Sequence, residues 1–249
     1  MEHILILAGG KGTRMGQDIP KVLTEIGGEP MIFRLLKSIK YICDIPTMVV
    51  GFGSDDILKS VGKNADYVFQ AEQLGTGHAV ACAKKKLEKE NYDNIIVIPG
   101  DHPLISGETI KDMLTSHKES GAVITVSFVR VGSYAGIEKV FYNCGRVIKN
   151  KRGEVVDIVE LKDANDLQKE IKDANVSYYC FDAKWLWETI DKLKNDNKAG
   201  EYYLTDLIKI SVDQDEKINS FNIKDSIEGM GVNTPEQKKM IEDIIKKQS

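Results

Sequence analysis

The chain has 249 residues, 42% of them hydrophobic and 29% charged, a composition that suits a folded domain with a sizeable core and excludes a disordered chain. Its formal net charge of −4 argues against a nucleic-acid coat or a binder of anionic membranes, so neither kind of partner is expected. Any phosphate site must therefore be a local cluster of positive charge.

Targeting signals are not apparent. No apolar run approaches the roughly 20 residues that span a bilayer, and the start Met1-Glu-His lacks the basic region and long apolar core of a signal peptide. The cysteines are too far apart for a Cys-x-x-Cys zinc site or a disulfide scaffold; they are Cys43, Cys82, Cys144 and Cys180. These features favour a reduced, cytoplasmic compartment.

The predicted elements of the first half alternate between strands and helices, which indicates an α/β layered fold with a largely parallel sheet. Gly27-Gly28 predicts a turn, Pro30 suits the first position of a helix, and Ser106 is expected to cap a helix that runs toward residue 120. We expect strands over 3–7, 47–52, 66–70 and 94–98, and helices over 31–42, 55–63 and 77–89.

The second half begins with a predicted strand over 122–131 and then changes character. From about 132 to 182 short extended pieces alternate with polar turns, which predicts a β-rich subregion attached to the sheet; the pieces are 139–141, 146–149, 155–161 and 176–181. Helices are expected over 184–194, 202–211 and 235–247, with a strand over 218–223. Since there is no repeat, low-complexity linker or hexapeptide β-helix pattern, we expect a single domain over 1–249.

The first predicted strand runs into a glycine-rich loop that ends at Lys21. Glycine allows positive φ and close approach to a ligand, and successive backbone N–H groups in such a loop bind phosphate oxygens. Arg14 can form a fork with phosphate, and Lys21 supplies a point charge. A strand, a glycine-rich turn and two basic residues are what a nucleoside triphosphate site requires.

The loop matches neither common glycine motif. Lys11 is followed by glycine rather than Ser or Thr, unlike a P-loop, and Gly10-Lys-Gly12 lacks the third glycine of a dinucleotide motif. A glycine-rich loop alone would fit an ordinary βα turn equally well. The full string Leu7-Ala-Gly-Gly-Lys-Gly-Thr-Arg-Met15, followed by Pro20-Lys21, resembles the signature of sugar-1-phosphate nucleotidyltransferases.

A second loop lies between a predicted strand and a predicted helix, with the sequence Gln70-Ala-Glu-Gln-Leu-Gly-Thr-Gly-His-Ala79. The Gln70 amide both donates and accepts hydrogen bonds, which suits the edge of a nucleobase. Gly-Thr-Gly alone is a weak signal. With the opening loop, the segment resembles N-acetylglucosamine-1-phosphate uridylyltransferases, as found in the N-terminal half of the bifunctional bacterial enzyme, and the resemblance runs from Ile4 to about Gln237.

The resemblance implies a Rossmann-like, three-layer nucleotide-diphospho-sugar transferase fold, with a mixed, mostly parallel sheet and the β-rich subregion on the sugar side. It does not extend to an acetyltransferase β-helix domain. It implies that Arg14 and Lys21 neutralise charge during catalysis. The nucleotide-binding residues that it implies are Leu7, Ala8, Gly9, Gly10, Gly12, Thr13, Gln70, Gln73, Gly75 and Thr76.

Two further segments carry candidate metal ligands. Asp101 follows Gly100 at the carboxyl end of a predicted strand, the edge of an open α/β sheet where ligands bind. Asn233 ends the segment Gly231-Val-Asn233. Each alone would fit a turn residue, but the resemblance implies that both bind Mg²⁺, a hard cation that prefers oxygen ligands. The two are so distant in sequence that their meeting tests the predicted fold.

The resemblance also implies a sugar pocket, with Gly100, Asn143, Glu160 and Asn175 as its residues and the segment Gly200–Asp206 lining it. The chain departs from the family here. Asn143-Cys-Gly-Arg146 stands where Gly-aromatic-Gly-Arg is usual, Val176-Ser177 stands where Thr-Gly is usual, and Pro99 replaces a frequent aromatic residue. These departures concern the acceptor sugar more than the nucleotide.

Histidines have no obvious catalytic task, because phosphoryl transfer to an ionised phosphate needs no general base. We therefore interpret His78, His102 and His117 as structural or solvent-exposed.

The expected reaction joins a nucleoside triphosphate, UTP by resemblance, to N-acetylglucosamine 1-phosphate with Mg²⁺ as cofactor, releasing pyrophosphate without a covalent enzyme intermediate. One alternative keeps the fold and changes the substrates, to a thymidylyl-, cytidylyl- or guanylyltransferase or a uridylyltransferase for another hexose 1-phosphate. A third hypothesis is a non-catalytic nucleotide-sugar-binding subunit, since fold alone does not imply function. The sugar, the pathway and the oligomeric state stay open.

Overall fold

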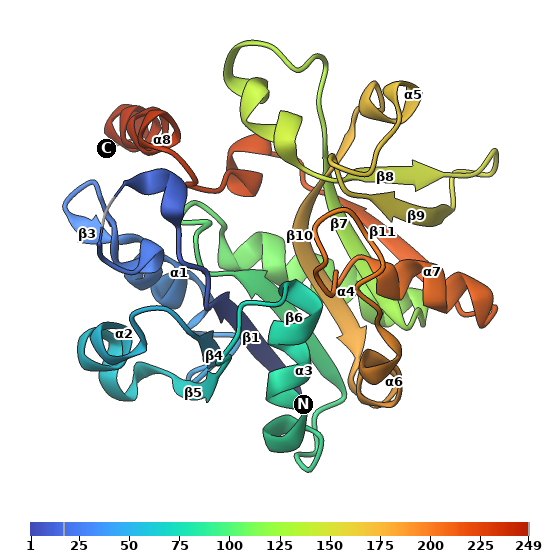
Figure 1. Ribbon diagram of the computed structural model, residues 1–249, viewed down its shortest axis with the longest axis horizontal. Helices are drawn as coiled ribbons and strands as arrows, with labels where there is room; N and C mark the ends of the chain where they lie inside the picture. Colours follow the sequence, from blue (N-terminus) through green and yellow to red (C-terminus); the bar gives the residue numbers. More distant parts are fainter. Residues whose placement is uncertain (17, 249) are drawn as a thin grey trace.

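The computed structural model describes residues 1–16 and 18–248, apart from the side chains of Thr13 and Gln248. Its centre is a nine-stranded sheet with the strand order β11-β7-β10-β6-β1-β4-β5, from which β8 and β9 branch (Figure 1). The strands are β1 (Glu2–Ala8), β4 (Thr47–Val50), β5 (Asp66–Phe69), β6 (Asn94–Pro99), β7 (Ile124–Arg130), β8 (Arg146–Lys149), β9 (Val155–Val159), β10 (Asp173–Asp182) and β11 (Ile218–Asn222).

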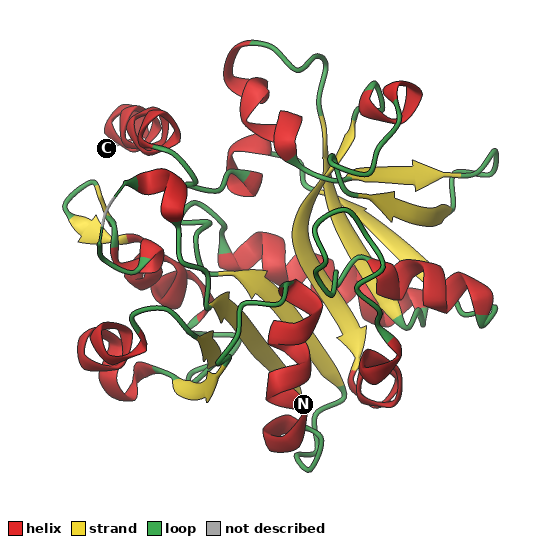
Figure 2. Cartoon of the chain, in the orientation of Figure 1, coloured by secondary structure: helices red, strands yellow, loops and turns green. Residues whose placement is uncertain are grey.

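Helices cover the sheet (Figure 2). The α-helices are α1 (Met31–Ile39), α2 (Ser54–Val61), α3 (Thr76–Leu87), α4 (Gly107–Ser120), α5 (Asp166–Lys169), α6 (Ala183–Thr189), α7 (Asp206–Asp213) and α8 (Pro235–Gln248). Shorter 3₁₀ segments are η1 (Thr13–Met15), η2 (Lys21–Leu23), η3 (Gly62–Asn64), η4 (Gly136–Asn143), η5 (Ile190–Lys192) and η6 (Ser226–Gly229). Among the described residues, no helix is both long enough and apolar enough to cross a bilayer.

The direction of the strands confirms the expected mixed, largely parallel sheet. In the seven-strand path only β10 runs against its neighbours, antiparallel to both β6 and β7. The pairs β1–β4, β1–β6, β4–β5 and β7–β11 are parallel. A parallel pair needs a crossover segment, and the helices between these strands supply it.

Two apolar clusters sandwich the sheet, which gives the three layers. Residues of a strand alternate between its faces: Ile4 and Ile6 of β1 join the cluster that includes α1, α2 and α4, whereas Leu5 joins the cluster that includes α3, α6 and α7. Because both faces are buried, the central strands are continuous apolar runs, which is why they were predictable from sequence.

A small hairpin follows the glycine-rich loop. β2 (Glu25–Ile26) and β3 (Glu29–Pro30) pair across Gly27 and Gly28, which both have positive φ. The predicted turn is thus confirmed, and Pro30 lies one position before its expected place, as the residue that precedes α1. The Ser106 cap is also confirmed, since its hydroxyl accepts a hydrogen bond from the Thr109 amide at 3.1 Å.

The β-rich subregion is confirmed in part. β8 and β9 form an antiparallel hairpin that joins β10 at Ala174. The expected extended piece at 139–141 is wrong, because these residues lie in η4; two apolar residues after a lysine cannot distinguish a strand from a helical turn. α5 was missed, although Asn165 and Gln168 form a capping box at its start.

The helix expected over 202–211 begins only at Asp206. Residues 202–205 instead run along the second loop: the Tyr202 amide donates to the Leu74 carbonyl at 2.8 Å, and the Gly77 amide donates to the Tyr202 carbonyl at 2.8 Å. The apolar residues have helical spacing, but these long-range backbone hydrogen bonds keep residues 202–205 out of the helix. Sequence periodicity carries no information about such contacts.

Arg146 at the start of β8 is fully buried, and no carboxylate among the described residues pairs with it. Its guanidinium donates to the backbone carbonyls of Lys169, Cys144 and Tyr142, and it lies 4.3 Å from the ring centre of Tyr134. The charge is therefore satisfied by carbonyl dipoles and an aromatic face, and it ties η4, α5 and β8 together.

We expect Arg146→Met to lower the free energy of unfolding by about 3 kcal/mol or more, because buried carbonyls would lose a charged donor. Urea denaturation followed by circular dichroism measures this change. Arg152→Met, at an exposed turn residue, is the matched control and should change stability by less than about 0.5 kcal/mol. An equal effect of the two variants would contradict the assignment of Arg146 as a structural anchor.

Candidate active site

The candidate site lies at the edge of the sheet where neighbouring parallel strands end. β1 leads into Gly9, β5 into Gln70, and β6 into Gly100 and Asp101. Because β10 is antiparallel, its first residues, including Asn175, reach the same edge. Together these segments surround a cavity of about 540 Å³, in the place where open α/β sheets bind ligands.

Most of the residues singled out from sequence line this one cavity. They are Leu7, Ala8, Gly9, Gly10, Arg14, Lys21, Gln70, Gln73, Gly75, Thr76, Asp101, Asn143, Glu160, Asn175 and Asn233. Two do not line it. Gly12 packs against Lys21, since a Cβ added at Gly12 would lie 2.8 Å from Cβ of Lys21. Gly100 packs against Val22, since a Cβ added there would lie 3.0 Å from Cγ1 of Val22. The Thr13 side chain lies outside the described residues.

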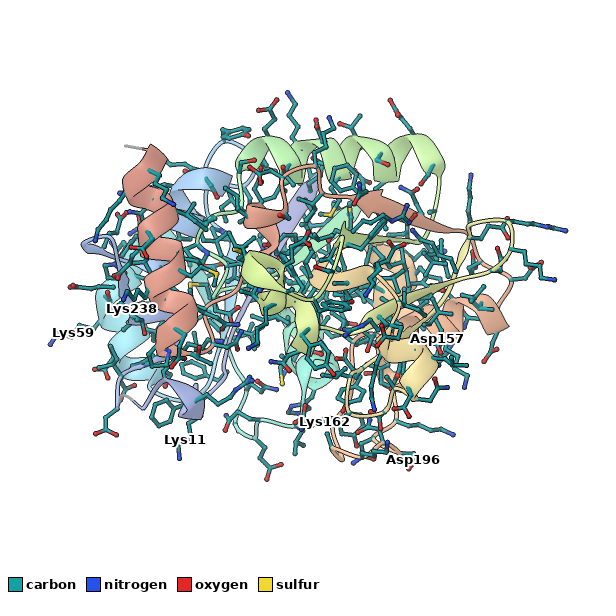
Figure 3. All side chains as sticks on the ribbon, turned by 90° about the horizontal axis from the view of Figure 1, so that it is seen from above. Lys11, Lys59, Asp157, Lys162, Asp196 and Lys238 are labelled. Atoms are coloured by element: carbon teal, nitrogen blue, oxygen red, sulfur yellow. The ribbon has the colours of Figure 1, made fainter. Side chains whose placement is uncertain are left out.

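The glycine-rich loop is fixed by a buried apolar residue directly after each of Arg14 and Lys21. Met15 and Val22 are both buried in the core, and the Met15 amide donates to the Gly12 carbonyl at 2.9 Å. Gly12 has a φ of +60°, a conformation that favours glycine. The loop therefore holds Arg14 and Lys21 over the carboxyl end of β1. In Figure 3, Lys11 of this loop and Lys162, after β9, project from the same edge of the molecule.

The Lys21 ammonium joins the two candidate metal ligands. It forms an ion pair with Oδ2 of Asp101 and donates to Oδ1 of Asn233 at 2.7 Å, and Arg14 Nη2 reaches the same amide oxygen at 3.3 Å. The Val232 amide also donates to the Asp101 carbonyl at 3.0 Å. Residues 101 and 233 thus meet in one place, as the predicted fold requires.

The Asp101 carboxylate and the Lys21 ammonium are both largely buried. Burial alone would raise the pKa of Asp101, but the charge of Lys21, the neighbouring His102 and the hydrogen bond from Lys21 outweigh it, and the pKa lies below its ordinary value. The carboxylate is therefore held ionised next to a cation.

On the side of β5, Gln70 is buried and its amide nitrogen donates to the Gly75 carbonyl at 3.1 Å. Gly75 has a φ of +109°, and a Cβ there would lie 2.6 Å from the Tyr202 carbonyl oxygen. The segment 202–205 therefore clamps the second loop, with Thr76 Oγ1 accepting from the Leu204 amide at 3.1 Å. The loop presents its backbone edge to the cavity.

The opposite end of the cavity is acidic and aromatic. Burial raises the pKa of Glu160, although its hydrogen bond from Thr205, at 3.3 Å, acts in the other direction. The Asn175 amide donates to the Tyr179 hydroxyl at 2.7 Å. Between these two residues the pairing of β10 with β7 is irregular, and Ser177 takes a φ of +63°. Such a bulge redirects side chains toward a site.

Sequence reasoning missed several residues of the cavity. They include Tyr179 and Gln237, and also His102, which the sequence analysis interpreted as structural or solvent-exposed. His102 is in fact largely buried and 2.7 Å from the Tyr178 hydroxyl; burial lowers its pKa, against the opposing effect of Asp101. Its position beside Asp101 in the motif was a usable signal. Gln237 accepts from the Asn233 amide at 2.6 Å, a contact that only the fold reveals.

Comparison with known families decides the class of protein. A model of the MobA-like NTP transferase domain matches residues 4–205. The chain belongs to this family. The expectation of a nucleotidyltransferase of the sugar-1-phosphate kind is thereby confirmed.

Curated relatives agree with this assignment. The chain is 39% identical over 232 residues to the bifunctional protein GlmU of Streptococcus mutans and 39% identical over 230 residues to that of Bacillus licheniformis. These matches cover 93% and 92% of this chain but 49% of each relative, so the chain spans about half the length of the curated relatives it matches.

A solved structure agrees with the fold. A crystal structure of UDP-glucose pyrophosphorylase complexed with UDP-glucose matches over 100% of both chains, with a TM-score of 0.77 and 18% sequence identity. At this identity the likeness concerns the fold, which is the expected nucleotidyltransferase fold.

We expect Lys21→Met to reverse the sign of the pKa shift of Asp101. In the wild type the carboxyl should titrate below its ordinary value of about 3.9, and without the ammonium, burial should raise it above that value. Carboxyl carbon NMR of the metal-free protein, assigned with Asp101→Asn, measures this titration. Lys59→Met, on the exposed side of α2, is the control and should leave it unchanged. An unaltered titration in Lys21→Met would refute the coupling.

Proposed function

We propose that the chain transfers the uridylyl group of UTP to N-acetylglucosamine 1-phosphate, with Mg²⁺ as cofactor, as one nucleotidyltransferase domain over 1–249. The observation that carries this proposal is that the glycine-rich loop, its two cations, Asp101 and Asn233 all line one cavity. The match to GlmU proteins supports the choice of substrates.

The triphosphate is assigned to the glycine-rich loop, whose backbone N–H groups and two cations suit its oxygens. The base is assigned to the second loop, where Gln70, Gly75 and Thr76 offer an amide and backbone groups at one wall of the cavity. The two loops follow β1 and β5, which are parallel strands on either side of β4, so base and phosphates would bind along the carboxyl edge of the sheet.

The donor set fits a hard divalent cation. Asp101 Oδ2 and Asn233 Oδ1 converge on one positive group, the Lys21 ammonium, which stands where a cation would sit. No cluster of three or more His, Cys, Asp or Glu side chains suited to a metal occurs among the residues that the structure describes, and two protein ligands suit Mg²⁺, which keeps waters and phosphate oxygens. When bound, Mg²⁺ would neutralise phosphate charge between the two substrates.

The residues of the site act by position and charge. A phosphate oxygen of the sugar 1-phosphate attacks the α-phosphorus in line, the bond to the β-phosphate bridging oxygen breaks, and pyrophosphate leaves. Arg14 and Lys21 stabilise the charge that grows on the phosphoryl oxygens. Lys21 must then exchange its contacts with Asp101 and Asn233 for contacts with phosphate.

The sugar is assigned to the acidic end of the cavity, with Glu160 and Asn175 as hydrogen-bonding partners of its hydroxyl and acetamido groups. The departures from the family pattern, Asn143, Cys144 and Ser177, also line this end. Because these departures lie on the sugar side, the alternative function is uridylyl or thymidylyl transfer to another hexose 1-phosphate.

Pyrophosphate release tests the proposal directly. UTP and dTTP should each be combined with Mg²⁺ and with separate hexosamine and hexose 1-phosphates. We expect the highest kcat/KM with UTP and N-acetylglucosamine 1-phosphate. Faster turnover with dTTP or with a hexose 1-phosphate would contradict the proposed substrates and assign the faster pair instead. The absence of pyrophosphate from every pair would favour the hypothesis of a non-catalytic nucleotide-sugar-binding subunit.

Arg14→Ala and Lys21→Ala should each lower kcat by about 10²-fold or more, as expected when one donor to a transition state is removed. Steady-state rates of pyrophosphate release measure the effect. Lys11→Ala is the matched control: Lys11 belongs to the same loop, but its ammonium lies over the Phe52 ring, and kcat should not change. Wild-type turnover in both the Arg14 and Lys21 variants would contradict the assignment.

Glu160→Gln should raise the KM for the sugar 1-phosphate about tenfold or more and leave the KM for UTP unchanged, because a charged acceptor of hydrogen bonds is lost on the sugar side only. Initial rates with one substrate varied at a time separate the two constants. Glu170→Gln, at an exposed residue after α5, should alter neither. Equal changes in both KM values would argue for general disruption of the cavity.

A further inference from the structure

The orientation of one side-chain amide at the nucleotide end of the cavity is fixed by a residue that the proposed function does not use. The amide is that of Gln70, which is buried. Its Nε2 atom lies 3.1 Å from the Gly75 carbonyl oxygen and 3.1 Å from Nδ1 of His78, in the first turn of α3. Gln70 and Gly75 line the cavity, whereas His78 does not.

These two neighbours decide which end of the Gln70 amide faces which side. A carbonyl can only accept a hydrogen bond, so the atom beside the Gly75 carbonyl must be the amide nitrogen. That nitrogen has a second hydrogen, and Nδ1 of His78 must therefore accept it. The proton of the neutral imidazole is then on Nε2, which lies 3.8 Å from Sγ of Cys82, a weak acceptor. Both hydrogens of the Gln70 amide are thus used within the protein.

The amide oxygen of Gln70 is the atom that it can offer to a ligand. Oε1 lies beside Gly9 of the glycine-rich loop, because a Cβ added at Gly9 would lie 2.7 Å from it. Gly9 lines the cavity. The side chain therefore presents an acceptor, and no donor, to a nucleobase at this wall.

We propose that His78 is a positioning residue for base selection: it keeps the acceptor atom of Gln70 turned to the base, so that the site selects a pyrimidine with a hydrogen on N3. Uracil and thymine have this N–H group, whereas N3 of cytosine is an acceptor that Oε1 would repel. A site built to hydrogen-bond an N–H group rejects the analogue that lacks it. The inference rests on the base position of the proposed function, and it disfavours cytidylyl transfer.

His78 strengthens a preference that Gly75 alone would set. If the Gln70 amide flipped, its oxygen would face both the Gly75 carbonyl oxygen and the lone pair on Nδ1 of His78, and acceptors that meet in a buried place are costly. Without the histidine acceptor, only the carbonyl opposes the flip. The flipped amide would present N–H to the base and suit cytosine. Removing the acceptor should therefore narrow the gap between UTP and CTP, rather than weaken both equally.

Two variants separate the acceptor from the bulk of the ring. His78→Phe keeps a ring near Tyr202, whose ring centre lies 6.3 Å from that of His78, but removes the acceptor. His78→Asn loses the ring and keeps an acceptor near the position of Nδ1. Lys85→Ala, at an exposed residue of α3, is the control.

Calorimetry with UTP and with CTP, in the presence of Mg²⁺ and without a sugar phosphate, measures the two dissociation constants. Their ratio should favour UTP in the wild type. It should fall about fivefold or more in His78→Phe, as expected for the loss of one hydrogen bond, and stay near the wild-type value in His78→Asn and Lys85→Ala. 3-Methyluridine triphosphate, which has no hydrogen on N3, should bind the wild type about tenfold or more weakly than UTP.

Equal affinity of the wild type for UTP and CTP would overturn the proposal, as would an unchanged ratio in His78→Phe. A ratio lost in His78→Asn but kept in His78→Phe would assign the effect to ring packing and overturn it too. Pyrophosphate release that persists in any of these cases would leave the proposed transfer reaction standing. Preference for UTP that depends on His78, in a protein that releases no pyrophosphate, would instead reject the transfer reaction alone.

Discussion

The contact of the Lys21 ammonium with Asp101 and Asn233 is the interaction on which the candidate site depends. It joins three segments that are remote in sequence: the loop after β1, the turn after β6 and the residues before α8. The largely buried carboxylate would be costly without an opposite charge, so the ammonium stabilises the closed arrangement of these segments. The same contact brings the oxygens of Asp101 and Asn233 together where a dication would bind. The proposed dication would therefore account for an acidic residue in a site proposed for phosphates.

The cavity is polarised along the carboxyl edge of the sheet. Arg14 and Lys21 stand at one end, and Glu160 and Glu201 at the other. A substrate with a phosphate at one end and hydroxyl groups at the other matches this distribution, and the overall charge of −4 does not oppose it, because the cations are concentrated in one loop. The segment 202–205 holds the second loop and contacts Glu160 through Thr205, so its non-helical form is part of the site.

Sequence reasoning predicted the central strands because both faces of the sheet are buried, so these strands are continuous apolar runs. It predicted most helices because their apolar residues recur at helical spacing. It also brought together the two glycine loops, Asp101 and Asn233, whose motifs are local. It failed where distant contacts decide the local structure. Residues 202–205 lie outside the helix because Tyr202 pairs with the second loop and residues 204 and 205 form a turn, and η4 forms around the buried Phe141. The roles of Tyr178 and Gln237 depend on partners far along the chain.

β10 places consecutive residues on opposite faces of the sheet, and its irregular stretch lies next to both ends of the cavity. Tyr178 packs in the cluster that includes α1 and holds His102, whereas Tyr179 packs in the cluster that includes α3 and binds Asn175. An inserted or deleted residue between positions 175 and 179 would disturb both neighbourhoods at once.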